Sequence, residues 1–101
     1  MVEPTPSRAY ARGLFGACGI RELDERPLVG VACSWNELVP GHVHLDQVAR
    51  AVQEGVRASG ANGVIFHTMA LCDGICQGAG MHAVLPSREV VAATVELTAR
   101  A

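Results

Sequence analysis

The sequence predicts an α/β fold with parallel strands and helices packed on the sheet, and three observations lead to it. Two short apolar runs, 27–35 and 62–71, are typical of strands that are buried on both faces. The segment between them, 43–60, carries the apolar spacing of an amphipathic helix. Strands that alternate with helices favour a parallel sheet with right-handed crossovers.

The first expected element is a helix over residues 7–20. Ser7 can cap its start, its apolar residues fall at helical spacing, and Gly19 can end it. Residues 1–7 carry two prolines and no periodic pattern, so we expect a loose leader there. The first strand follows as "LVGVAC" after Pro27, and the segment "NELVPGH" leaves it as a loop.

The helix expected over 43–60 has the clearest pattern in the chain. Asp46 in its first turn and Arg57 in its last suit the helix dipole, and Gly60 is a natural end. Its apolar stripe consists of Leu45, Val48, Ala49, Val52 and Val56. This stripe predicts one helix face packed on the sheet.

The second strand, within 62–71, leads into a glycine-rich stretch, 73–80, and then into a closing helix over 85–101. Ser87 is the expected N-cap of that helix. Both segments have the apolar character of central strands, so we expect further strands from outside this pair to lie beside them. We therefore expect this chain to be a piece of a larger domain.

Composition narrows the possible functions. The 101 residues suit one small domain, half of the residues are apolar, and the net charge is −2. The cations are all arginines in no basic run, and aromatic residues make up 4% of the chain, so we expect no nucleic-acid partner. No apolar run approaches the ~20 residues of a membrane span. The start lacks a secretory pattern, so we expect a cytoplasmic protein with reduced thiols or metal-bound cysteines.

Polar residues gather in two loops that follow the two strands, 33–44 and 71–86. Ligands of open parallel sheets collect beyond the carboxyl ends of the strands, and neighbouring parallel strands put these loops at one edge. The residues expected to converge there are Asn36, Glu37, His42, His44, Asp73 and His82.

Asp73, followed by Gly74, supports two interpretations. An aspartate before glycine commonly forms a turn, with its side chain bonded to nearby backbone N–H groups. Alternatively, its carboxylate is an oxygen ligand for a hard divalent ion such as Mg²⁺, which takes one or two protein carboxylates and leaves positions open for substrate oxygens. Gly74 would let the backbone approach the ligand closely.

The cysteines and histidines also leave alternatives open. His67, Cys72, Cys76 and His82 supply four nitrogen or sulfur ligands of the kind zinc prefers, although their spacing departs from the usual C-x2-C form. His42 and His44 could be general bases or ligands, and the alternative role for them is capping or packing. The other two cysteines, Cys18 and Cys33, are expected to be small buried residues of a helix and a strand.

Three motifs occur in order: "PGHVHL" at 40–45, "CDGI" at 72–75 with a later Gly-Met, and "LPSRE" at 85–89. Together they resemble the N-terminal part of the dihydroxy-acid dehydratases. These enzymes belong to the IlvD/Edd dehydratase family, which also contains sugar-acid dehydratases and 6-phosphogluconate dehydratase. The resemblance runs from about Arg8 to the end of the chain.

The resemblance implies a hydro-lyase that removes water from a 2,3-dihydroxy acid to give a 2-oxo acid, as in valine and isoleucine synthesis. It implies an iron–sulfur cluster that acts as Lewis acid on the departing hydroxyl, a nearby Mg²⁺, and a homodimeric full-length enzyme. The aspartate of the DGI motif is a Mg²⁺ ligand in the family, and this role carries over to Asp73.

The sequence departs from the family pattern at three points. Gly41 stands where one branch has a cluster-binding cysteine, so the chain resembles the branch with a four-iron, four-sulfur cluster whose ligands lie elsewhere. Cys72 stands where other members commonly have a residue that is not a ligand. The stretch between the DGI and LPSRE motifs is one residue shorter than expected, around 77–80.

Family members are several times longer, so residues 8–101 are expected to be a truncated N-terminal domain. The family's CDK motif and its serine base would lie beyond residue 101, so we expect no catalytic residue in this chain and no activity from it alone. Two other functions stay open: a sugar-acid dehydratase of the same family, and a small non-enzymatic metal-binding module built on zinc.

Overall fold

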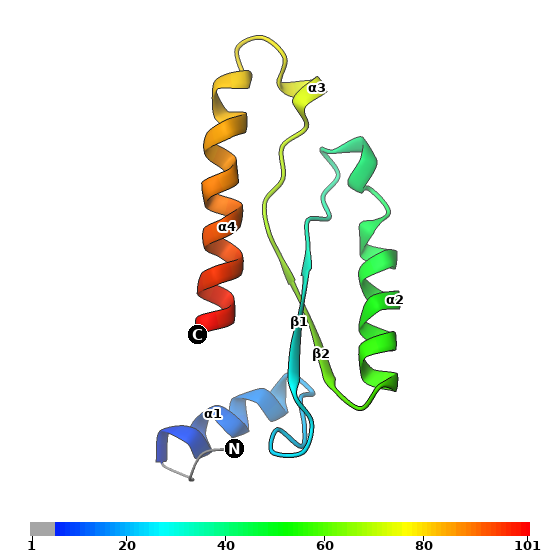
Figure 1. Cartoon of the computed structure of the whole chain (residues 1–101), viewed down its shortest axis with the longest axis vertical. Coiled ribbons are helices and arrows are strands. Elements are labelled where there is room, and N and C mark those ends of the chain that lie inside the picture. Colours follow the sequence, from blue (N-terminus) through cyan, green and yellow to red (C-terminus); the bar gives the residue numbers. More distant parts are fainter. Residues whose placement is uncertain (1–5) are drawn as a thin grey trace.

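The computed structural model describes residues 6–101, and its elements alternate as the sequence predicts (Figure 1). Helices and strands follow one another along the chain, with two short 3-10 turns before α2 and α4. The elements are α1 (Pro6–Ala17), β1 (Leu28–Cys33), η1 (Pro40–His42), α2 (Leu45–Ala58), β2 (Asn62–His67), α3 (Asp73–Cys76), η2 (Met81–Ala83) and α4 (Val84–Arg100).

The two strands form a parallel pair, which confirms the predicted fold class. The register runs from Leu28 opposite Asn62 to Cys33 opposite His67. One more bond extends the ladder at the carboxyl end, where the backbone N–H of Thr68 donates to the Cys33 carbonyl at 3.0 Å. Helix α2 is the crossover between the strands and packs against both of them.

Helix α2 lies close to β2 at Gly63, where a side chain would be tightly crowded. A Cβ atom on Gly63 would come within 3.2 Å of the Gln53 carbonyl oxygen and of the Val56 side chain. The Gln53 side chain also links α2 to β2 at this point, because its Nε2 donates to the Gly63 carbonyl at 3.0 Å. Ala49, from the predicted stripe, is buried at this interface, whereas Val48 and Val52 remain about half exposed.

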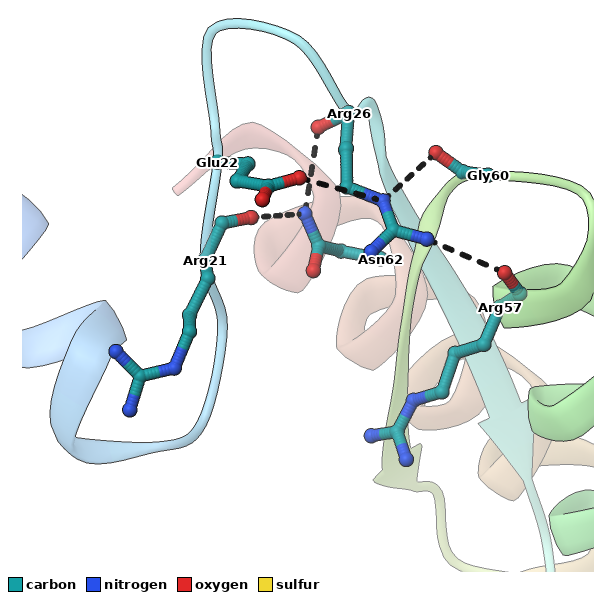
Figure 2. Close-up of polar contacts among 6 residues, drawn as sticks. All are labelled: Arg21, Glu22, Arg26, Arg57, Gly60 and Asn62. Atoms are coloured by element: carbon teal, nitrogen blue, oxygen red, sulfur yellow. Dashed lines mark hydrogen bonds and ion pairs between the residues drawn. The ribbon is translucent and has the colours of Figure 1, made fainter.

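The amino end of the sheet is held by two side chains, which Figure 2 shows between the loop before β1 and the end of α2. Arg26 donates through Nε to the Gly60 carbonyl at 3.0 Å and through Nη2 to the Arg57 carbonyl at 3.3 Å. Asn62 donates through Nδ2 to the Arg21 carbonyl at 2.8 Å. Gly60 has a φ of 96°, so it ends α2 as predicted.

Helix α1 runs from Pro6 to Ala17, and the predicted stop residue, Gly19, follows its end with a φ of 83°. Proline suits the first helical position, so Ser7 lies inside the first turn and is not the N-cap. Cys18 was expected to be buried in this helix; that expectation is wrong, because Cys18 follows the last helical residue and is exposed. Residues 1–5 of the expected leader lie outside the described residues.

Helix α4 begins earlier than expected, and the prediction that Ser87 is its N-cap is wrong. The turn η2 leads directly into the helix at Val84, so Ser87 lies inside the first turns. Its Oγ donates to the Val84 carbonyl at 2.6 Å. Pro86 does not oppose this earlier start, because the first N–H groups of a helix need no partner within it.

Within residues 6–101, only one face of the sheet is covered by a closely packed helix, α2. In Figure 1, α2 and α4 flank the strands on opposite sides, but among the described residues only α2 packs closely on them. Leu28 of β1 is 48% exposed, so the expectation of a strand buried on both faces is not met within these residues. The radius of gyration is 16.9 Å, whereas a compact domain of this length has about 13 Å.

No helix within residues 6–101 has the combination of length and apolarity that crossing a bilayer demands.

The close approach of α2 to β2 predicts a large effect of one substitution. Gly63→Val should lower the free energy of unfolding by about 1–3 kcal/mol, because the added atoms crowd the Gln53 backbone carbonyl and the Val56 side chain. Gly55→Ala, on α2 with open space around it, should raise that free energy by up to about 1 kcal/mol. Urea denaturation of both variants measures the difference; equal effects would mean that the close contact does not constrain the packing.

Candidate active-site edge

The two loops that follow the strands meet at one edge of the sheet, as the parallel register requires. The contact is made by Asn36, whose Nδ2 donates to the Ala70 carbonyl at 3.2 Å. A ring contact lies beside it, where Trp35 meets His67 edge to face with centroids 6.5 Å apart. The 33–44 loop therefore contacts the segment directly after β2 at Ala70, which adjoins the predicted 71–86 loop.

The first loop is fixed by its own hydrogen bonds. Asn36 Oδ1 accepts from the backbone N–H groups of Leu38 and Val39, both at 2.9 Å. Trp35 Nε1 donates to the Val43 carbonyl at 3.1 Å, and the Val39 side chain is buried. The loop is thus held on both sides of the turn η1.

His42 is oriented by this loop. Its Nδ1 lies 2.9 Å from the Ser34 carbonyl oxygen and 3.3 Å from Ser34 Oγ. Because a carbonyl oxygen only accepts, the contact with Ser34 requires the proton to sit on Nδ1. His44 is exposed at the N-cap position of α2 and makes no capping bond, so the capping role suggested for it is wrong.

Asp73 is the first residue of α3, a single helical turn, and its side chain is exposed. A turn-forming aspartate bonds nearby backbone N–H groups through its carboxylate. The Asp73 carboxylate makes no hydrogen bond or ion pair with any other residue in 6–101, so the turn-only interpretation lacks the contact on which it depends. Its carboxylate oxygens are available to a ligand.

Asp73 borders a groove of about 520 Å³ between α4 and the carboxyl ends of the strands. Most of the lining is aliphatic and comes from α4 and the segment after β2. The polar lining residues are Ser34, Thr68, Asp73, Ser87 and Arg88. The Arg88 guanidinium makes no hydrogen bond or ion pair within the described range, so the groove lining holds an available cation, Arg88, and an available anion, Asp73.

The expected convergence of six polar side chains is met only in part. Asp73 lines the groove, and Asn36 joins the two loops without lining it. The lining does not include Glu37, His42, His44 or His82, and of these four only His42 is partly buried. Arg88 and Ser34 were missed, although the LPSRE motif places an arginine where α4 begins.

The cysteines and histidines do not form a metal centre in the described part of the chain. No group of three or more His, Cys, Asp or Glu side chains in residues 6–101 is placed to hold an ion, so the four proposed zinc ligands are not brought together. All four cysteines are free thiols. Cys33 is buried as expected, with Sγ 3.7 Å from the Leu45 carbonyl oxygen.

The family model described as dihydroxy-acid/6-phosphogluconate dehydratase N-terminal matches residues 26–101. The chain belongs to this dehydratase family. Curated relatives agree over nearly the whole chain. A dihydroxy-acid dehydratase of Ignicoccus hospitalis is 54% identical over 95% of this chain, and one of Pyrococcus furiosus is 50% identical over 92%. Dihydroxy-acid dehydratase 1 of Methanosarcina acetivorans is 45% identical over 100% of it.

This dehydratase chain spans less than one fifth of the length of those relatives: 18%, 17% and 19%. The matched part begins at the loop before β1 and includes both strands, the groove and α4. The segment that matches the family model therefore includes the residues that form the candidate site.

The placement of the thiols predicts the outcome of a zinc assay. A structural zinc needs four ligands converging at about 2.0–2.3 Å, and residues 6–101 do not supply such a group. We expect purified protein to carry well under one equivalent of zinc, with no change when Cys72 and Cys76 are both replaced by serine. One tightly bound equivalent that the double substitution removes would restore the zinc interpretation.

Proposed function

We propose that this chain is the N-terminal part of a hydro-lyase that converts 2,3-dihydroxy carboxylic acids to 2-oxo acids, as in valine and isoleucine synthesis. The observation that carries the proposal is Asp73, an available carboxylate at the carboxyl edge of a parallel sheet, bordering a groove. The name dihydroxy-acid dehydratase, borne by the relatives, supports the substrate class.

The residues at this edge fit one side of a Mg²⁺ site. Asp73 offers a carboxylate without a competing partner among residues 6–101, and Ser34 and Thr68 line the same groove. Mg²⁺ needs only one or two protein carboxylates when water and substrate oxygens fill its other positions. A bound ion would supply the positive charge that orients substrate oxygens.

The other groove residues bind and orient the substrate in this proposal. The Arg88 guanidinium attracts the substrate carboxylate, since it lines the groove and has no ion-pair partner in the described part of the chain. The Ser34 hydroxyl donates to a substrate oxygen, the Thr68 hydroxyl, which donates to the Met69 carbonyl at 3.1 Å, accepts from a substrate hydroxyl, and the aliphatic side chains of α4 limit the access of water. The base that removes the substrate proton comes from the remainder of the longer enzyme.

An iron–sulfur cluster, of the four-iron, four-sulfur type, is the second cofactor of the proposal. The cysteines of this chain do not fit such a cluster by themselves, because no group of three potential ligands comes together in residues 6–101. Gly41 has open space around it and offers no ligand atom. The cluster ligands therefore come from the remainder of the enzyme, and this chain alone is inactive.

A sugar-acid dehydratase is the second candidate. The matching family model covers both dihydroxy-acid and 6-phosphogluconate dehydratases, and an arginine that faces the groove suits either a carboxylate or a phosphate. Parallel assays with 2,3-dihydroxy-3-methylbutanoate and with 6-phosphogluconate decide between them.

The proposal also includes a cytoplasmic enzyme that acts as a homodimer on a small acid. The four free thiols suit a reducing compartment. The exposed apolar side chains on α4 and β1 form a surface that the remainder of the longer enzyme or a second subunit would cover.

The role of Asp73 predicts that Asp73→Asn lowers turnover far more than stability. Asparagine keeps the shape of the side chain and removes the charge that a hard cation requires. In the longer enzyme we expect turnover to fall at least about 100-fold, equivalent to roughly 2.7 kcal/mol, with partial recovery as Mg²⁺ is raised.

Asp46→Asn is the matched control, because Asp46 is also an exposed aspartate in the first turn of a helix, away from the groove. The turnover of Asp46→Asn should stay within about twofold of that of the unsubstituted enzyme. The melting temperature and the iron content should be unchanged in both Asp46→Asn and Asp73→Asn. Near-normal turnover of Asp73→Asn at low Mg²⁺ would return Asp73 to an ordinary surface residue.

A further inference from the structure

We infer that Asn36 is a positioning residue that holds the Asp73 segment at the sheet edge, an inference that rests on the proposed role of Asp73. Asn36 uses its side-chain amide in two directions. Its Oδ1 accepts two backbone N–H bonds within its own loop, and its Nδ2 donates to the Ala70 carbonyl in the other loop. Ala70 precedes Asp73 by three residues.

Few other contacts tie the Asp73 segment to the sheet. The ladder ends at the bond from Thr68 to Cys33. Within residues 6–101, the bond from Asn36 is the only hydrogen bond between the 34–44 loop and the segment beyond Thr68. The remaining hydrogen bonds of this segment are internal, such as the one from the Cys76 N–H to the Cys72 carbonyl at 2.9 Å. Among the hydrogen bonds of residues 6–101, one side chain, that of Asn36, thus joins the Asp73 segment to the first loop.

The chemistry of the contact requires an amide. Aspartate at position 36 would keep an oxygen for the N–H groups of Leu38 and Val39, so the local loop would persist. It would replace the donor with a second acceptor facing the Ala70 carbonyl oxygen, and two acceptors repel. The two loops would separate there, while α2 and the strand pairing would keep their contacts.

Asn62 supplies a matched control at the opposite end of the sheet. It too is a partly buried asparagine whose Nδ2 donates across loops to a backbone carbonyl, that of Arg21 at 2.8 Å. Asn62→Asp removes the same type of bond but leaves the Asp73 edge untouched. A general loss of stability would appear in both variants, and a positioning effect would appear only in Asn36→Asp.

The test uses the longer enzyme freed of divalent ions, with Mg²⁺ alone as probe. Calorimetric titration gives the Kd for Mg²⁺, and hydrogen exchange gives the protection of backbone amides 70–76. We expect Asn36→Asp to raise the Kd at least about tenfold and to speed exchange in 70–76, with both quantities unchanged in Asn62→Asp. Asn36→Ser removes the amide donor without adding charge, and it should also raise the Kd and speed exchange in 70–76. This variant replaces Asn36→Asp in the test if the aspartate variant does not fold.

An unchanged Kd and unchanged exchange in the Asn36 variants would overturn the inference. Equal changes in the Asn36 and Asn62 variants would also overturn it, because they indicate a general loss of stability. If the unsubstituted enzyme binds Mg²⁺ but Asp73→Asn binds it equally well, the proposed role of Asp73 fails. The exchange measurement then still decides whether Asn36 holds the segment.

Discussion

The parallel pairing of β1 with β2 across the α2 crossover is the constraint on which the other features depend. A parallel pair sends both chains out at the same end, so the two loops that follow must share one edge. The pairing also packs α2 so closely on β2 that a side chain at position 63 would be crowded by Gln53 and Val56. The site that contains Asp73 is therefore a consequence of strand direction, and not of any local motif alone.

Each end of this unit is secured by an asparagine. At the amino end, Asn62 and Arg26 bind backbone carbonyls of the preceding loop and of the α2 terminus (Figure 2). At the carboxyl end, Asn36 binds the segment before Asp73. Carbonyls at helix ends and in loops lack ladder partners, and these side chains satisfy some of them. The opposite face of the sheet lacks closely packed helix within residues 6–101, which agrees with a chain that matches only the first part of longer relatives.

Much of this fold is predictable from sequence because it follows from periodicity. The stripe on α2, the glycine at its end and the two apolar runs give the elements and their parallel arrangement. The start of α4 is not predictable in this way, because a serine beside a helix resembles a cap until η2 shows that the helix has already begun. The site is harder still. Topology predicts which loops come together, but it does not predict the direction of each side chain. Asp73 lines the groove, whereas His82 and Glu37 do not. Arg88 was missed because a helix pattern alone does not show which arginine faces a cavity.

The most direct test of the central claim, that the carboxyl edge of the parallel pair holds a divalent ion at Asp73, is paramagnetic broadening by Mn²⁺, a hard ion that suits the same oxygen ligands. Backbone amide resonances of the isotope-labelled enzyme are recorded during titration with Mn²⁺. The structure predicts that amides of 34–36 and 68–75 broaden first, that those of 57–62 at the opposite end do not, and that excess Mg²⁺ reverses the effect. Broadening that spares 68–75, or that persists unchanged in Asp73→Asn, would contradict the claim.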